Sequence, residues 1–122
     1  MTYLRRRKPS NLTGDKAELQ ALLHLQKQGL QLLHRNYYCP YGEIDLIMHD
    51  KQTLVFIEVR YRKNNTFGGA LASINRVKQR KIIATAEFFL AEQKNEYNCR
   101  FDVIAIDDSV TSPLWIQDAF QV

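Results

Sequence analysis

The chain has 122 residues, 45% of them hydrophobic, which is enough for one domain with one core and too few for two. No stretch approaches the roughly 20 apolar residues of a membrane span, so we expect a cytoplasmic protein with no membrane partner. Cys39 and Cys99 lie far apart and outside any CxxC pattern, which argues against a disulfide framework and against a zinc site. The net charge is +4, but acids and bases are distributed unevenly along the chain.

The bases gather in two segments that contain no acid. Residues 1–8 carry four bases, and residues 60–81 carry seven. A stretch of this kind is typical of a surface that binds a polyanion, here nucleic acid and foremost DNA; a solvated basic helix face is the alternative. The nucleic-acid contacts predicted from the second segment are Arg62, Lys63, Arg76, Lys78, Gln79, Arg80 and Lys81. For Lys78 and Gln79, an exposed helix pair without a ligand is the competing interpretation.

The chain begins with a basic tail over residues 1–12, and residues 13–122 are expected to form a single domain without internal repeats. Asp15 and Glu18 have the spacing of a capping box, and the apolar stripe that follows predicts a helix over about residues 16–28. As the second acid of such a box, Glu18 needs no catalytic role.

Three extended segments follow the first helix and are separated by turn-forming residues. They lie at about residues 30–38, 43–49 and 53–61. Because the connections are short, an antiparallel meander is the economical arrangement.

A second helix is predicted over about residues 73–94, with the basic cluster on its first turns. A strand is predicted at about residues 100–107, and a helix between two strands favours a right-handed crossover that makes the strands parallel. A last extended stretch, at residues 114–120, is expected at the edge of the sheet. The fold class is therefore α/β, with a mixed sheet flanked by helices.

Acidic residues are predicted to share one face of the meander. Strand residues alternate between faces, which places Glu43 and Asp45 on one side of the second strand. If the four residues 49–52 close the hairpin, Asp45 faces Phe56 and Glu58 faces Glu43, with Asp45 diagonal to Glu58. Three carboxylates then crowd one patch.

Such a patch is costly unless something offsets its charge, because like charges repel across a sheet. A divalent cation is the simplest compensation, and oxygen ligands select Mg²⁺ or Mn²⁺. These ions support phosphodiester hydrolysis, and Arg60, on the same face, is placed to bind a phosphate oxygen. The alternative is an ordinary surface network in which Glu43 and Glu58 pair with Arg35, Arg60 or Arg62.

Two further groups of residues are open to structural interpretations. Tyr37, Tyr38 and Tyr41 could stack on unpaired bases, but aromatic residues beside a sheet are more often part of the core. Asp102 follows Arg100 by two residues and is expected to form a structural ion pair that fixes the last strand.

Several of these motifs together resemble a known family, the YraN-type family of small bacterial proteins, which is related to archaeal Holliday junction resolvases within the restriction-endonuclease-like superfamily. The similarity is specific because the motifs keep their order and spacing from residue 14 to residue 103. The matching pieces are Gly14-Asp15-Lys16-Ala17-Glu18, Arg35-Asn36-Tyr37, Gly42-Glu43-Ile44-Asp45-Leu46-Ile47, Phe56-Ile57-Glu58-Val59-Arg60-Tyr61-Arg62, Gly68-Gly69, Lys78-Gln79 and Arg100-Phe101-Asp102-Val103.

The resemblance implies a restriction-endonuclease-like αβββαβ core and a metal-dependent endonuclease that acts on branched or structured nucleic acid. It implies catalytic roles for Glu18, Asp45, Glu58 and Arg60, with Asp45, Glu58 and Glu18 as ligands of Mg²⁺ or Mn²⁺. Resolvase-like chemistry also makes a homodimer conceivable.

One position departs from the superfamily pattern, which usually has lysine where this chain has Arg60. Arginine stays charged and can clamp a phosphate, whereas only lysine can lose a proton and act as a general base. A nucleic-acid-binding module with weak or no activity is therefore the alternative function. An interaction protein whose basic helix binds an acidic partner is a third.

Overall fold

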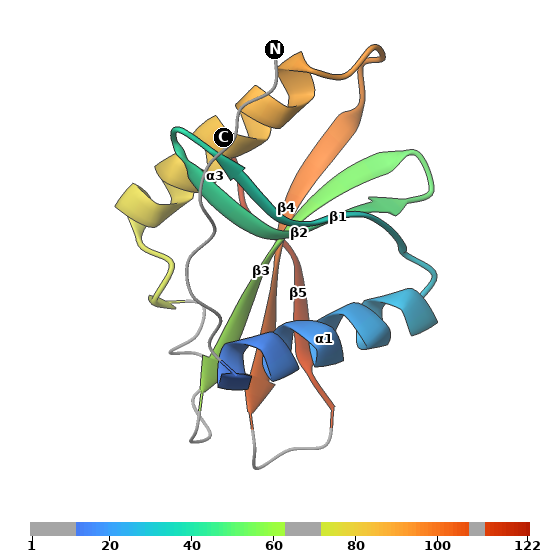
Figure 1. Ribbon diagram of the computed structural model, residues 1–122, viewed down its shortest axis with the longest axis vertical. Coiled ribbons are helices and arrows are strands. Elements are labelled where there is room, and N and C mark those ends of the chain that lie inside the picture. Colours follow the sequence, from blue (N-terminus) through green and yellow to red (C-terminus); the bar gives the residue numbers. More distant parts are fainter. Residues whose placement is uncertain (1–11, 63–71, 108–111) are drawn as a thin grey trace.

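The computed structural model describes residues 12–62, 72–107 and 112–122, and these form a five-stranded sheet with a helix on each face (Figure 1). The elements, in chain order, are α1 (Leu12–Lys27), β1 (Gln31–Cys39), β2 (Gly42–Asp50), β3 (Thr53–Arg62), α3 (Arg76–Ala91), β4 (Asn98–Asp107) and β5 (Leu114–Phe120). The predicted strands and the second helix are confirmed to within a few residues at each end. The mixed α/β class is also confirmed, and the element order is compatible with an αβββαβ core.

The sheet is mixed, with one parallel pair in an otherwise antiparallel order. Its strands lie in the order β1-β2-β3-β4-β5, and β3 pairs with β4 in parallel. The parallel arrangement follows from the chain passing through α3 between these two strands, as expected for a crossover connection. This order makes β3, which carries Glu58, the central strand.

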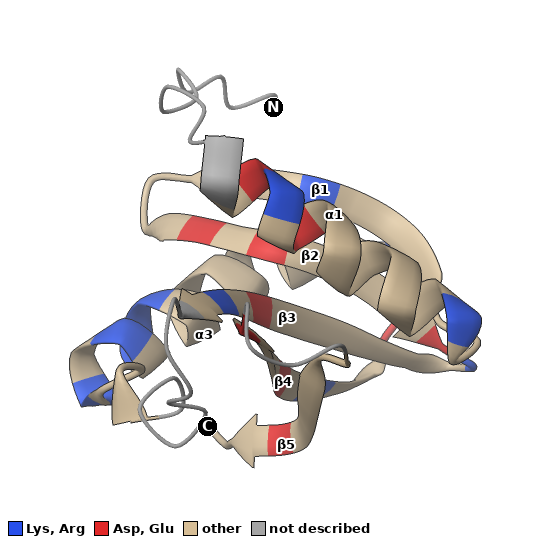
Figure 2. Ribbon diagram, turned by 90° about the horizontal axis from the view of Figure 1, so that it is seen from below, with Lys and Arg blue, Asp and Glu red and all other residues tan. Residues whose placement is uncertain are grey.

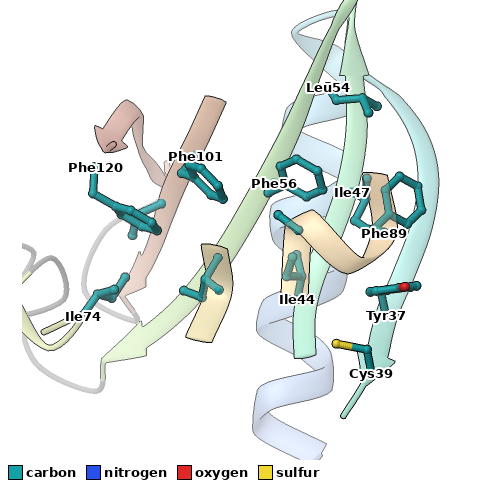
Figure 3. Close-up of a cluster of buried hydrophobic side chains, with 13 residues drawn as sticks. Tyr37, Cys39, Ile44, Ile47, Leu54, Phe56, Ile74, Phe89, Phe101 and Phe120 are labelled. Atoms are coloured by element: carbon teal, nitrogen blue, oxygen red, sulfur yellow. The ribbon is translucent and has the colours of Figure 1, made fainter. Parts of the chain in front are cut away.

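Two apolar clusters fix the helices on opposite faces of the sheet. On the α1 side, Ala21 and Leu25 pack with strand residues such as Val55. On the α3 side, an aromatic row crosses the sheet: the ring of Phe56 stacks on Phe101, which stacks on Phe120 (Figure 3). Phe89 of α3 packs edge-on against Phe56 and Tyr37.

The first helix begins earlier than the capping-box interpretation predicts. Helix α1 starts at Leu12, so Asp15 lies within its first turn and is not its cap. The capping-box prediction is wrong because the chain before Asp15 is itself helical. At the other end the prediction is right: Gly29 has φ of 99°, a left-handed conformation that glycine adopts without strain.

Candidate functional site at the fork between β2 and β3

The hairpin between β2 and β3 closes more tightly than predicted. Asp50 pairs with Thr53, so only Lys51 and Gln52 form the turn, and Lys51 has φ of 58°. The observed register moves each partner by two residues relative to the predicted four-residue loop. An even shift keeps the faces, and it brings Asp45 to the level of Glu58, one step beyond the last pair of the ladder, Leu46 with Ile57.

Strand β2 bends at Asp45, and this corrects the predicted strict alternation. Ile44 and Ile47 pack together in the cluster on the α3 side, whereas Leu46 packs on the α1 side. Beyond Leu46 the β2–β3 ladder ends, and the Asp45 carboxylate accepts the backbone N–H of Val59 at 2.8 Å in its place. Asp45 therefore sits where the two strands separate, and Figure 1 shows β2 and β3 diverging as a fork.

The fork brings together carboxylates from three elements. Figure 2 shows acidic positions on α1, β2 and β3 on neighbouring ribbons. Burial raises the pKa of the Asp45 carboxyl well above its usual value, and the nearby charges of Glu58 and Glu18 raise it further. The hydrogen bond from Val59 N–H acts in the opposite direction but is outweighed. Asp45 thus retains its proton at a pH at which an exposed aspartate is ionised.

Glu18 reaches the fork from α1 and is held there by β1. Its carboxylate is 7% exposed and accepts hydrogen bonds from Arg35 Nη2 at 3.2 Å and from Asn36 Nδ2 at 2.9 Å. Asn36 has φ of 52°, a left-handed conformation that asparagine tolerates better than most residues. These contacts position Glu18, so its role is not that of a helix cap.

Glu58 is flanked by two cations from different elements. It is 5% exposed, and its Oε2 lies 3.2 Å from Arg60 Nη2 and 3.3 Å from Lys78 Nζ. Lys78 is positioned by the start of α3, where the Asn75 side chain accepts the Lys78 backbone N–H at 2.9 Å. Within the described residues, Arg60 Nε is buried without a hydrogen-bond partner. The fork thus has an acidic centre and a basic side.

Asp45 and Glu58 are the residues best placed to hold a divalent cation. Within the ranges described, no three His, Cys, Asp or Glu side chains lie close enough together to form a metal site. The predicted three-carboxylate ligand set is therefore not preformed, and Glu18 is occupied by Arg35 and Asn36. A facing pair still suits Mg²⁺, which commonly binds through one or two carboxylates.

The predicted basic cluster on α3 divides between two faces of the helix. Lys78 and Lys81 line a small cavity with the β1–β2 turn, beside the fork. Arg76 and Arg80 line a separate depression with the C-terminal residue Val122. The pairs face different surroundings because residues three or four apart share a helix face.

The other three predicted nucleic-acid contacts are Gln79, Arg62 and Lys63, and of these the structure describes only the Gln79 side chain. The Gln79 side chain donates to the backbone oxygen of Ile74 at 3.0 Å, which stabilises the approach to α3. Arg62 is the last residue of β3, but its side chain lies outside the described residues, as do Lys63 and the Gly68-Gly69 pair.

The sequence does not predict the roles of two residues at this site, Arg35 and Asn36. Arg35 was considered a partner of Glu43 or Glu58 but binds Glu18, and no role was predicted for Asn36. Their only sequence signal was the motif they form with Tyr37. Tyr37 itself is a core residue: its ring is 8% exposed and its hydroxyl donates to Glu92 at 3.0 Å, so the base-stacking interpretation is wrong for it.

In the described part of the chain, neither helix has the length and apolar character needed to cross a membrane.

A UPF0102 protein of Psychromonas ingrahamii is 63% identical over 112 residues, which are 92% of each chain. UPF0102 protein Pfl01_4685 of Pseudomonas fluorescens is 52% identical, and the match covers 88% of this chain and 92% of that protein. A UPF0102 protein of Janthinobacterium sp. is 48% identical, and the match covers 98% of this chain and 95% of that protein. Residues 17–106 match the model of uncharacterised protein family UPF0102, and the chain belongs to this family.

Proposed function

We propose that this protein is a metal-dependent endonuclease that hydrolyses phosphodiester bonds in branched or structured nucleic acid, foremost DNA. The observation that carries the proposal is that the Asp45 carboxyl lies beside Glu58 at the fork, where burial and the charge of Glu58 raise the pKa of Asp45. Buried acids placed against each other destabilise a fold. Such an arrangement is characteristic of functional sites.

The donor set fits a hard divalent cation. Asp45 and Glu58 would hold Mg²⁺ or Mn²⁺ through carboxylate oxygens, with Glu18 close enough to raise the pKa of Asp45. When bound, such an ion would supply a Lewis acid for the phosphoryl group and lower the pKa of water. Its charge would also stabilise the ionised form of Asp45, because an adjacent cation favours a carboxylate over a carboxylic acid.

The cations around Glu58 would bind the anionic substrate. Arg60 and Lys78 reach the same carboxylate oxygen from β3 and from α3, so both lie beside the proposed reaction centre. A phosphate group could exchange places with Glu58 as their partner and would receive two charge-assisted contacts. A guanidinium group is a permanent cation in proteins, so the role of Arg60 would be to bind and stabilise a phosphate and not to accept a proton.

The preference for branched substrates rests on the resemblance to Holliday junction resolvases, and the surface beside the fork is compatible with it. Lys81 extends the basic side of the site along α3 beyond Lys78. Contacts to phosphates give affinity without sequence preference, as expected for an enzyme that recognises the shape of its substrate.

One observation favours a second function, a nucleic-acid-binding module without catalysis. Glu58 is already paired with Arg60 and Lys78, so the protein itself offsets part of the acidic charge. A metal ion would then have to compete with these cations.

Cleavage of a labelled four-way DNA junction, compared with a linear duplex of equal length, tests the proposal. The wild type should cut the junction in Mg²⁺ and not in EDTA, and Asp45→Asn and Glu58→Gln should each lose cleavage by about 100-fold or more. Glu96→Gln, an exposed carboxylate elsewhere in the chain, is the matched control. Binding of the junction without cleavage in Mg²⁺ or Mn²⁺ would favour the binding module, and absence of binding would overturn both functions.

A further inference from the structure

We propose that the cavity between the β1–β2 turn and α3 is a subsite for one unpaired nucleotide, whose base stacks on Tyr41 and whose phosphate contacts Lys81. The proposal rests on the proposed function, because it places this nucleotide next to the phosphate that would be cut. It adds a recognition element for the branch point itself, since an unpaired base leaves its own stack at a lower energetic cost than a paired base.

The cavity is small, and its lining combines an aromatic ring with basic side chains. Its volume is about 230 Å³, below the roughly 300–1,000 Å³ of pockets for drug-sized ligands, so a larger molecule would not fit well. One aromatic ring, two ammonium groups and one carboxylate meet there. Its lining residues are Pro40, Tyr41, Gly42, Glu43, Lys78, Lys81 and Ile82.

Tyr41 is the aromatic residue available for stacking. Its side chain is 58% exposed, whereas Tyr37 is buried in the core. The ring of Phe88 meets Tyr41 in an edge-to-face arrangement, with 6.1 Å between the ring centroids. Stacking on an aromatic side chain suits every base, because each base has a π face, and this recognition is independent of sequence.

The turn that carries Tyr41 is fixed against the helix that carries the lysines. Gly42 has φ of 153°, and a Cβ atom at this position would lie 3.2 Å from Thr85 Oγ1 and 3.9 Å from Lys81 Cβ. Thr85 in turn donates to the backbone oxygen of Lys81 at 2.7 Å. The backbone of the turn is therefore packed closely on the helix that carries the lysines, which lowers the entropy lost when a nucleotide binds between them.

Lys78 connects this cavity to the fork. It lines the cavity and also lies 3.3 Å from Glu58 Oε2. A nucleotide stacked on Tyr41 would thus have a phosphate close to Lys78. Lys78 in turn contacts Glu58, which belongs to the acidic pair. Because Lys78 borders both the cavity and the fork, a base stacked on Tyr41 would influence which phosphodiester bond enters the fork.

Fluorescence of a 2-aminopurine base tests the subsite without any need for cleavage. The probe is a DNA duplex with a single bulged 2-aminopurine, titrated with protein in EDTA at constant salt. Wild type and Tyr41→Phe should change the fluorescence of the base as it leaves the DNA stack for the ring, whereas Tyr41→Leu should leave the fluorescence unchanged and should bind the bulged duplex on the order of tenfold more weakly. Tyr97→Leu, at the opposite end of β2 beside His49, is the matched control and should behave as wild type.

The same titrations on a fully paired duplex separate stacking from charge. Tyr41→Leu should leave this affinity unchanged, whereas Lys81→Gln should weaken binding to both duplexes. Equal losses of affinity on both duplexes for Tyr41→Leu, or a fluorescence change that persists without the ring, would overturn the subsite. Because the readout is binding in EDTA, a protein that never cuts DNA would refute the proposed function and leave this test intact.

Discussion

Two aspartates of the sheet, one fully buried and one half-buried, accommodate their carboxyl groups in opposite ways. Asp102, on β4, is fully buried and accepts from Arg100 Nε at 3.1 Å, from Trp115 Nε1 at 2.9 Å and from the Asp118 backbone N–H at 2.9 Å. Asp45, on β2, accepts one backbone N–H and otherwise faces carboxylates. The protein neutralises the first acid with its own donors and leaves the second beside like charges.

The contrast distinguishes a structural acid, Asp102, from Asp45, the acid that we propose to be functional. The ion pair expected between Arg100 and Asp102 is confirmed, and it is part of a larger network because Arg100 also lies 2.9 Å from Asp50. This network joins β4 to β5 and to the β2–β3 turn. A buried acid with a complete set of partners has little capacity left for a ligand, whereas an acid among acids requires one.

The largest expected effect is the loss of the structural acid. Asp102→Ala leaves the Arg100 charge and the Trp115 N–H without their main acceptor, so the free energy of unfolding in urea should fall by about 3–5 kcal/mol. Asp102→Asn should cost less because it keeps an acceptor. Binding of Mn²⁺ by the folded fraction, measured by calorimetry, should not change. A loss below about 1 kcal/mol for the alanine variant would show that this network is not structural.

Replacement of Arg60 should affect function and not folding. Arg60→Ala removes a cation beside Glu58, and we expect cleavage of a four-way junction to fall by about 100-fold while binding falls much less. Arg60→Lys keeps the charge and should preserve or increase cleavage. If Arg60→Ala cuts the junction as the wild type does, the arginine has no role in stabilising the transition state.

The two basic faces of α3 should differ in their contribution to DNA binding. If Lys78 and Lys81 both contact phosphates, replacing them with Gln should reduce the slope of log affinity against log salt by roughly 1.8. Replacing Arg76 and Arg80, which face the C-terminal residue, should reduce it by less than one unit. Fluorescence anisotropy with one duplex over a range of salt concentrations measures both. A larger change for the arginine pair would move the interface to the other face.

The smallest expected effect is a gain in stability when the functional acid is neutralised. The folded-state pKa of Asp45 is raised, so ionising Asp45 destabilises the fold as pH rises from the unfolded value of about 3.9 through the raised value. Asp45→Asn removes this charge and keeps an acceptor for the Val59 N–H. Its melting temperature in EDTA should exceed that of the wild type at pH 8 by several degrees and approach it near pH 4.

Added Mn²⁺ should reverse this order, because only the wild type would be stabilised by the ion. If Asp45→Asn instead destabilises the protein in EDTA as strongly as Asp102→Asn does, the distinction between the two acids fails.

The sequence predicted the strands well because short runs rich in β-branched and aromatic residues are bounded by turn-forming residues, and it placed Asp45 and Glu58 on neighbouring strands. It did not predict their direct opposition, because the residues from His49 to Gln52 are compatible with a turn of two or of four residues. The bend at Asp45 was also missed, since strict alternation assumes that β2 remains paired to its end. The Asp45 carboxylate takes the place of a backbone acceptor for the Val59 N–H, and such a substitution leaves no periodic pattern in the sequence.

The environment of Glu18 required tertiary information. Its spacing from Asp15 favoured a capping box, and only the packing of α1 against the sheet brings Glu18 to Arg35 and Asn36. The division of the α3 bases into two faces could have been anticipated from helical spacing, but which face meets the fork depends on how the helix lies on the sheet.

The parallel pairing of β3 with β4 has a consequence for the newly synthesised chain. Strand β3 is complete at Arg62, but its neighbour begins only at Asn98. Until then one edge of an apolar strand, which includes Val55, Phe56 and Ile57, has no partner. Such an edge is a template for pairing with other chains, so fragments that end before β4 should aggregate during expression, whereas the complete chain protects this edge by its own later half.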